Sequence, residues 1–275
     1  MNSNKHSKNF WIAVLLWLAA LVTLFPFFWM GSTALKGARE LFLRPPVFVP
    51  HYPEWSNFAK VFTVAPFGRY FMNSAIVAGL SVILTVFINL LAGYTFAKYR
   101  FKGRKVLLLM IVATMMVPFQ VIMVPNFIII SALGWLNSYL GLIIPRAAEA
   151  FGLFLSKQFM DDIPDELIEA ARIDGQSEFR IFTGIILPNC RPLIGVLATF
   201  TFMWRWNDFI WPLIILSKKE MFTVQLGMSN LIGQFYVEWN LLMAVALLSV
   251  LPVLAIFLMF QRFFVQGITT TGMKG

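Results

Sequence analysis

The side chains best suited to bind a polar ligand lie together in one strongly apolar stretch. Arg205 and Asp208 are three residues apart there, beside Trp204, Asn207 and Trp211. At this spacing the two charges can pair along a helix. If the stretch crosses a membrane, each charge costs at least about 2.5 kcal/mol, so such residues usually have a function. Aromatic rings with amide and carboxylate groups suit the C–H faces and hydroxyls of sugars, so we expect either a substrate pathway or a polar clamp to a second subunit, with equal weight.

A second polar cluster surrounds two prolines of another apolar stretch. Pro118 and Pro125 free backbone carbonyls within about two turns of helix, and Gln120 and Asn126 lie beside them. Broken helices at membrane depth line a cavity or are covered by protein. We expect a pathway or hinge role here, or simple kinks filled by neighbouring helices.

Two further polar pairs are predicted to be less important. Asn73 and Ser74 open an apolar stretch, and Arg146 and Glu149 stand near the start of another. The last two are three residues apart, so we expect them to form an ion pair within one helix.

Residues 161–192 form a charged segment between two apolar stretches and hold seven of the thirteen acidic residues. Pro164 suits the first position of a helix, and Asp165 and Glu166 place negative charge at its positive end. Gly175 stands where a left-handed residue would end that helix. We therefore predict a helix from Pro164 to Asp174. Its predicted apolar face consists of Ile163, Leu167, Ala170 and Ala171.

A second helix is predicted to follow directly. Ser177 can cap it, it runs toward Leu187, and Pro188 and Pro192 separate it from the next apolar stretch. A helix, a glycine hinge, a second helix and a proline stop could be an ordinary amphipathic hairpin that links two spans. The spacing of residue types over residues 169–188 favours a more specific role.

Glu169-Ala170-Ala171, Gly175, Ile185, Leu187 and Pro188 are in the register of a known loop. The segment resembles the EAA loop of ABC importer permeases, whose helix docks into a cleft on the ATPase subunit. The resemblance implies that Glu169 fixes the loop through hydrogen bonds and that the two alanines provide a close-fitting face. The residues expected to couple to an ATPase are Glu166, Leu167, Glu169, Ala170, Ala171, Asp174, Gly175, Ile185, Leu187 and Pro188.

Other segments extend the resemblance over nearly the whole chain. They are residues 206–209 with Trp211-Pro212, residues 118–125, and the tail at 261–267. The chain is similar to permeases of the carbohydrate-uptake (MalG-like) branch of binding-protein-dependent ABC importers. Membership implies an all-α, type I (MetI-like) permease fold, a second (MalF-like) permease, two ATPase subunits that bind ATP-Mg, and an extracytoplasmic solute-binding protein. Independently of the resemblance, the polar and aromatic residues of the apolar stretches predict a candidate pathway made of Gln120, Asn126, Trp204, Arg205, Asn207 and Asp208.

Composition predicts an integral membrane protein. Hydrophobic residues make up 59% of the 275 residues and charged residues 13%. Apolar stretches of about 20 residues can cross a bilayer. We predict one permease domain over residues 1–275 with six spans in the cytoplasmic (inner) membrane of a bacterium. The spans are expected at about 10–30, 71–97, 106–131, 139–159, 193–216 and 241–264, the first being an uncleaved span.

Basic residues predict the orientation. Residues 98–105 contain five Lys or Arg and no acid, so this loop is expected on the cytoplasmic side. Both termini and residues 161–192 then face the cytoplasm as well. The loop at 31–70 lies outside, where we expect either a docking surface for the binding protein or an ordinary connection.

Several kinds of chemistry have no sequence support. The chain contains no GxxxxGK[ST], HExxH or GxSxG motif, so we expect no catalytic residue, and any ATP must be hydrolysed by another subunit. Cys190 is the single cysteine, and His6 and His51 are isolated, which predicts no disulfide within the chain and no metal site. The net charge of +9 fits the bias of cytoplasmic loops, and nucleic-acid binding is not expected. The alternative is an ion- or proton-coupled secondary transporter without an ATPase partner.

Overall fold

The protein is helical throughout the part that the structure describes. The computed structural model describes residues 3–232 and 237–271. Within these ranges the only strand-like pairing is one isolated bridge between Ile232 and Val237. The helices divide between two compact units, one of residues 1–68 and 227–251 and one of residues 69–226 and 252–275.

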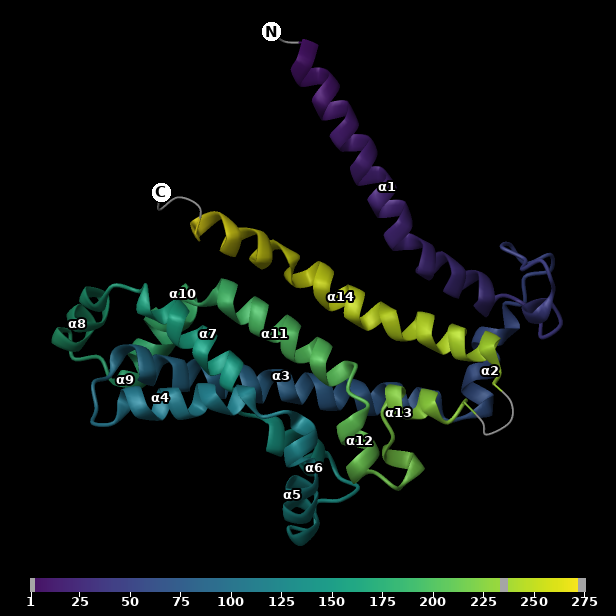
Figure 1. Cartoon of the computed structure of the whole chain (residues 1–275). Coiled ribbons are helices and arrows are strands. Elements are labelled where there is room, and N and C mark those ends of the chain that lie inside the picture. Colours follow the sequence, from purple (N-terminus) through teal and green to yellow (C-terminus); the bar gives the residue numbers. More distant parts are fainter. Residues whose placement is uncertain (1–2, 233–236, 272–275) are drawn as a thin grey trace. The chain divides into compact units, whose positions relative to one another are not determined.

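The first unit holds the beginning of the chain and the start of the last helix. It contains α1 (Ser3–Ala34), η1 (Glu40–Phe42), α2 (Ser56–Val64) and the first part of α14 (Trp239–Thr271) (Figure 1). The buried side chain of Asn57 joins α2 to the end of α1, because its Nδ2 donates to the carbonyl oxygens of Ala34 (2.9 Å) and Lys36 (3.1 Å). This contact fixes the backbone where α1 ends.

The second unit contains most of the shorter helices. Their order is α3 (Phe67–Lys98), α4 (Arg104–Ala113), η2 (Thr114–Met116), α5 (Phe119–Ala132), α6 (Tyr139–Ile143), η3 (Ile144–Arg146), α7 (Ala150–Asp161), α8 (Asp165–Ile173), α9 (Glu178–Ile181), η4 (Phe182–Ile186), α10 (Leu187–Asn189), α11 (Arg191–Trp206), α12 (Ile210–Ile215), η5 (Lys219–Met221) and the first half of α13 (Val224–Ser229), whose second half belongs to the first unit. The remainder of α14 completes the second unit.

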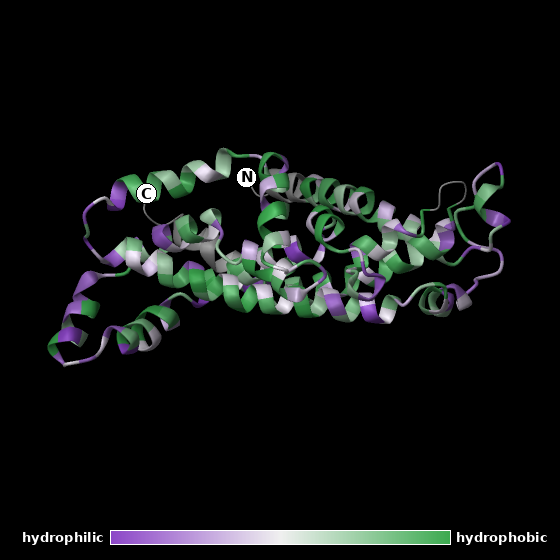
Figure 2. Cartoon of the chain, turned by 90° about the horizontal axis from the view of Figure 1, so that it is seen from below, coloured by the Kyte–Doolittle hydropathy of each residue, from purple (hydrophilic) through white to green (hydrophobic). Residues whose placement is uncertain are grey.

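Three described helices are long and apolar enough to cross a bilayer alone. They are residues 10–34 of α1, the whole of α3, and residues 239–263 of α14. Figure 2 shows how hydrophobic residues dominate the helices while hydrophilic residues gather in the connections. Counting each bent helix pair as one span raises the number to six, the number expected from the sequence.

The predicted third, fourth and fifth spans are not single straight helices. The helix pair ending at Met116 and beginning at Phe119 is bent by 103°, and the pair on either side of residues 147–149 by 45°. The predicted span at 193–216 is wrong as one helix, because α11 ends at Trp206 and α12 begins only at Ile210. Pro118 explains the first break, since proline has no N–H to donate and disfavours a helical residue before it.

Close contact between α3 and α7 organises the core of the second unit. A Cβ on Gly93 of α3 would lie 2.3 Å from the Ser156 side chain of α7, and one on Gly152 of α7 would lie 2.1 Å from Asn89 of α3. Small residues let membrane helices approach closely. Beyond this contact, α3 packs on α7 and α11 through Leu90, Met160 and Leu197.

Candidate functional site

The predicted helix in the charged segment is present and ends as its sequence indicates. It is α8, one residue shorter at each end than expected. Gly175 has φ +76°, the Gly175 N–H donates to Arg172 O, and the Gln176 N–H donates to Ala171 O, each over 3.0 Å. This pair of hydrogen bonds is a Schellman motif, which needs a left-handed residue where Gly175 stands.

The inner face of α8 differs from the predicted one. Ile168 and Ala171 are buried in the core of the second unit, at 2% and 4% exposure, whereas Leu167 and Ala170 are exposed. The predicted face is confirmed for Ile163 and Ala171, which are buried, and wrong for Leu167 and Ala170, which lie on the outer side of the helix; it also lacked Ile168. Ala171 therefore packs against the chain's own core, and the outward apolar side chains are those of Leu167, Ala170 and Ile173.

A lysine at the end of α3 holds the beginning of α8. The Lys98 ammonium, almost wholly buried, lies 2.7 Å from the Asp165 carboxylate and donates to the carbonyl of Ile163. The hydrogen bond from Lys98 lowers the pKa of Asp165 below its usual value, so this carboxylate keeps its charge. The start of α8 is therefore attached to α3.

Glu178 holds the other end of α8, a role that the sequence did not suggest. Arg172 Nε donates to Glu178 Oε1 over 2.7 Å, and the hydroxyls of Tyr94 and Tyr99 donate to Glu178 Oε2. We name Arg172, Glu178, Tyr94 and Tyr99 the Glu178 clasp. The hydrogen bonds expected from Glu169 are absent among the described residues, where its side chain is exposed. The sequence contained one indication of this role for Glu178, its negative charge directly after the capping residue Ser177.

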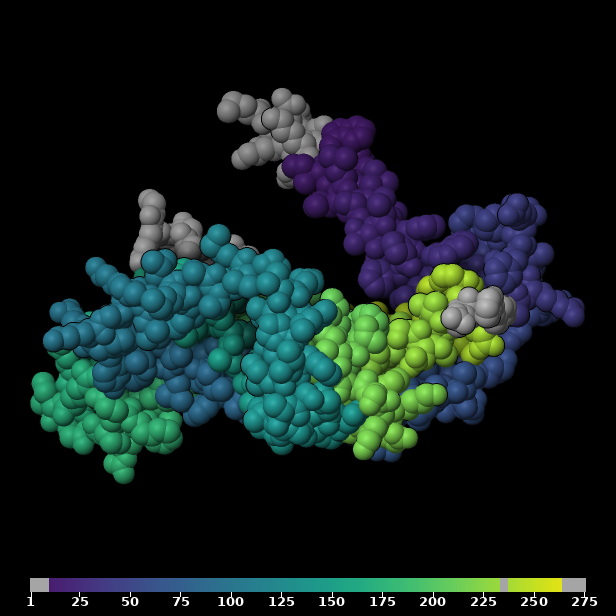
Figure 3. Space-filling view, turned by 60° about the horizontal axis from the view of Figure 1, so that its bottom comes forward, coloured from purple at the N-terminus to yellow at the C-terminus, as the bar shows by residue number. Residues whose placement is uncertain are grey.

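The second predicted helix also forms, with an irregular centre. The Ser177 hydroxyl accepts from the Arg180 N–H, as predicted, and α9 passes into a π-helical turn, η4, before α10. Ile185 and Leu187 are partly buried against the core, and Pro188 is exposed. The segment Glu178–Asn189 is bent by 80° from α11 at the fully buried Cys190. Figure 3 shows α8 to α10, in mid-green, as a lobe beside the blue surface of α3 and α4.

The polar residues of the fifth stretch pair differently from the prediction. Arg205 pairs with Glu149, and Arg146 pairs with Asp208, so both ion pairs join separate elements. The predicted pairs, Arg205 with Asp208 and Arg146 with Glu149, were wrong because a helix ends between the members of each. The Arg205 side chain is 2% exposed, and its Nη2 also donates to the carbonyl of Arg146 over 2.7 Å.

These crossed ion pairs bring together the breaks of three helical stretches. Arg146 and Glu149 flank the break before α7, and Asp208 lies in the break after α11. Phe119, directly after the break at Pro118, lies under the Arg146 guanidinium at 5.6 Å and against the Trp211 ring at 5.9 Å. We name this meeting point the polar junction. It places charge and aromatic faces where helices are interrupted, which is where polar ligands and moving parts are accommodated in membrane proteins.

The other predicted pathway residues take no part in the ion pairs of the junction. Trp204 is 42% exposed and stacks on Phe200 at 5.7 Å. Asn207 donates to the carbonyl of Met203 and accepts from Gln225 over 3.4 Å. Gln120 and Asn126 lie on α5 and make no side-chain hydrogen bond to another described residue.

Two asparagines have a larger structural role than expected. Asn73 Nδ2 donates to the carbonyls of Glu220 and Phe222, each over 2.9 Å, and Asn73 Oδ1 accepts from the Tyr139 hydroxyl. Asn137, at φ 54°, accepts from the backbone N–H groups of Ser217 and Lys218. Both asparagines join the segment after α12 to the rest of the second unit. The residues next to them in the sequence do not indicate these long-range hydrogen bonds.

The described residues contain no group of three or more His, Cys, Asp or Glu side chains that could hold a metal ion. The charges at the junction and in the clasp are instead compensated by arginine and tyrosine partners.

Comparisons with known proteins agree with this architecture. The family model described as binding-protein-dependent transport system inner membrane component matches residues 89–270. AraQ, permease of the arabinooligosaccharides transport system of Bacillus subtilis strain 168, is 34% identical over 262 residues, covering 94% of this chain and 93% of AraQ. UgpE, permease of the sn-glycerol-3-phosphate transport system of Pectobacterium atrosepticum, is 33% identical over 276 residues, covering 98% of each chain.

Solved structures share the fold. A chain from the crystal structure of a bacterial ABC transporter involved in the import of the acidic polysaccharide alginate aligns with a TM-score of 0.84 at 23% identity, over 96% of this chain and 98% of that one. A chain from the methionine ABC transporter MetNI, in an inward-facing conformation, aligns with a TM-score of 0.53 over 70% of this chain. With a family model that covers most of its length and relatives matched nearly end to end, this chain belongs to the family of inner membrane components of binding-protein-dependent transport systems.

Proposed function

We propose that this chain is the permease subunit of an ATP-driven importer that moves a sugar or oligosaccharide through the inner membrane of a bacterium. In this proposal an extracytoplasmic binding protein delivers the substrate, a second permease completes the pore, and two ATPase subunits hold ATP-Mg. Both termini and the segment from α8 to α10 face the cytoplasm. The names of AraQ and UgpE, and the aromatic and polar side chains around the junction, support a carbohydrate or related polyol as substrate.

The observation that carries the proposal is the double attachment of α8 to α3. Lys98 holds one end and the Glu178 clasp the other, while Leu167, Ala170 and Ile173 remain exposed between them. When an ATPase presses on the outer face of α8, these two attachments pass the force to α3. Coupling to an ATPase requires both an exposed docking face and a rigid attachment of that face to a membrane helix.

The mechanism that we propose is alternating access. Closure of the two ATPases moves α8 as a lever, and the left-handed Gly175 permits the angle between α8 and α9. Motion then passes through α3 and through the bend at Cys190 into α11, which ends at the polar junction. Arg205 pairs with Glu149, and Asp208 pairs with Arg146. These ion pairs connect the break before α7 to the end of α11 and the break that follows it.

Copurification tests the proposal directly. The tagged chain is purified gently in detergent with its native partners, and the partners are identified by mass spectrometry for the wild type and for a Glu169 and Gly175 double substitution. Recovery of an ATPase with the wild type and its loss with the double variant supports the proposal. Recovery of no ATPase with the wild type contradicts it and favours the secondary transporter.

A further inference from the structure

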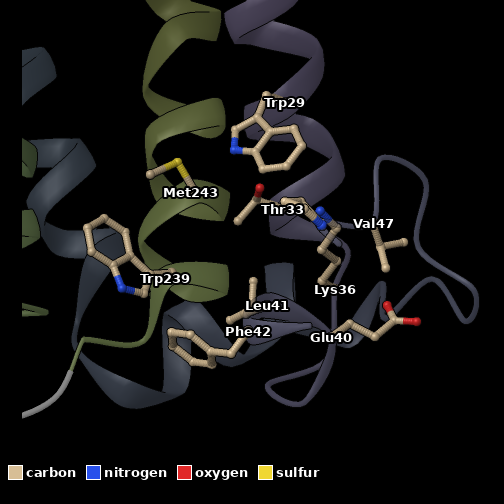
Figure 4. A pocket seen from close by; sticks show the side chains of 10 residues that line it. Trp29, Thr33, Lys36, Glu40, Leu41, Phe42, Val47, Trp239 and Met243 are labelled. Carbon is tan, nitrogen blue, oxygen red and sulfur yellow. The ribbon is translucent and has the colours of Figure 1, made fainter. Parts of the chain in front are cut away.

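A cavity of about 310 Å³ lies in the first unit, at the end of α1 and the start of α14. Figure 4 shows Trp29 and Thr33 of α1, Lys36 just after it, and Trp239 and Met243 of α14 around this space. All of its lining residues belong to the first unit. Small-molecule sites have volumes of about 300–1,000 Å³ and combine apolar walls with a few placed polar groups.

The cavity contains a buried ammonium group. Lys36 is 3% exposed, and its Nζ lies 4.3 Å from the centre of the Trp29 ring. Burial lowers the pKa of Lys36, and Glu40 partly offsets this. Asn57 fixes the lysine backbone through the Lys36 carbonyl. The described partner of its ammonium is the Trp29 ring.

Two oxygens of the lining also lack a hydrogen bond. The hydroxyl of Thr33, a residue 8% exposed, and Glu40 Oε2 are buried without any described partner. Glu40 Oε1, by contrast, accepts from both the backbone and the ring of His51. Buried polar atoms usually have partners, and each exception needs an explanation. An interfacial belt explains the two tryptophans but leaves these two oxygens unexplained.

We propose that this cavity binds one or two sugar units of a neutral oligosaccharide. The indole of Trp239 offers a face for the C–H side of a sugar ring, beside the Trp29 ring, which carries Lys36 and lies against Phe48. Sugar hydroxyls can accept from Lys36 and donate to Glu40 and Thr33, and so satisfy the two unpartnered oxygens. The charges of Lys36 and Glu40 offset each other, which favours a neutral polyol over a phosphate or another anion.

This inference rests on the proposed function, because a carbohydrate reaches the cavity only if the transporter handles one. It places a sugar site at the end of α1 and the start of α14, in the first unit, whereas the polar junction belongs to the second. Such a site would receive substrate on the outer side of the membrane before it enters the pore.

The test is fluorine NMR of the intact transporter, purified with its copurifying subunits in nanodiscs and labelled with 5-fluorotryptophan. The resonances of Trp29, Trp239 and Trp17 are assigned by replacing each with phenylalanine. The probes are arabinotriose and maltotriose, with inorganic phosphate and sn-glycerol-3-phosphate as anionic comparisons. Trp17, exposed on α1 away from the cavity lining, is the internal control.

We expect at least one neutral trisaccharide to shift the Trp29 and Trp239 resonances and leave Trp17 unchanged. Lys36→Met should weaken the midpoint of that shift about tenfold, because a charge-assisted hydrogen bond is lost. Lys60→Met should not weaken it, since Lys60 lies on α2 and pairs with Glu54. Thr33→Val is a milder second variant in case Lys36→Met fails to fold.

Three outcomes would overturn the inference. They are no shift with either sugar, a shift with the anions only, and an equal shift of Trp17. Uptake by the same preparation in proteoliposomes separates the two proposals. Sugar uptake without shifts at Trp29 and Trp239 rejects the cavity alone, whereas failure to recover an ATPase rejects the importer function.

Discussion

Arg205 pairs with Glu149 across two helical elements, although Asp208 stands only three residues further along the chain. Asp208 in turn pairs with Arg146. Each charged residue thus holds a partner beyond a helix break. Breaking such a buried pair leaves an uncompensated charge, which is far more costly than losing an exposed pair.

The crossed pairing makes a charge-swap experiment decisive. Arg205→Glu should destabilise the purified transporter by about 3–5 kcal/mol, because Glu149 then faces a like charge in a buried site. Adding Glu149→Arg should recover a large part of the lost thermal stability and uptake. Combining Arg205→Asp with Asp208→Arg should not, and recovery by that second combination would show that the two residues pair directly.

A β-branched residue at position 175 should disturb coupling. Gly175→Val forces a left-handed conformation on valine at a cost of about 1–2 kcal/mol and weakens the Schellman hydrogen bonds. We expect ATP hydrolysis to continue while sugar uptake falls several-fold in proteoliposomes. Gly175→Asn is the matched control, since asparagine tolerates this conformation. Equal loss with both variants would argue against a hinge.

Loss of the Glu178 carboxylate should loosen α8 without unfolding the protein. Glu178 is about half exposed, so we expect Glu178→Ala to lower local stability by only about 1 kcal/mol and to speed amide hydrogen exchange in Asp165–Ile173 about fivefold. Asp162→Ala, an exposed acid outside the Glu178 clasp, serves as the control. Unchanged exchange in Glu178→Ala would mean that Lys98 alone holds the helix.

The two neighbouring alanines of α8 should respond to enlargement in opposite ways. Ala171→Leu forces extra volume into the core and should cost about 1–3 kcal/mol of stability. Ala170→Leu projects outward, so thermal stability should be kept while copurification of the ATPase decreases. The comparison measures thermal unfolding and subunit recovery on the same preparations. Destabilisation by Ala170→Leu alone would reverse the assignment of the two faces.

Local rules predicted the charged segment well. Proline, acidic residues and glycine set the ends of α8, and Ser177 caps α9, because caps depend on a few adjacent residues. Apolar length similarly located α1, α3 and α14. The buried face of α8 was predicted only in part, because it depends on which neighbour the helix packs against, and a nine-residue helix with small side chains carries little pattern.

Long-range pairing could not be predicted from one sequence. Arg146 and Asp208 are 62 residues apart, and Tyr94 and Glu178 are 84 apart, so spacing along a helix carries no information about either contact. The predicted pair of Arg205 and Asp208 does not form because α11 ends at Trp206, between the two residues. That break falls at Asn207 and Asp208, residue types that favour turns over helix interiors, so a local signal was present although the surrounding stretch is apolar.

The full burial of Cys190 has a practical consequence. The chain's single thiol lies at the bend before α11 and is shielded from water-soluble maleimides, so a cysteine introduced at a surface position becomes its dominant labelling site. Asp162, exposed just before α8 and outside its proposed docking face, offers such a position. A label there, paired with a second one on a partner subunit, can follow the lever through a transport cycle by distance spectroscopy, with the native cysteine retained.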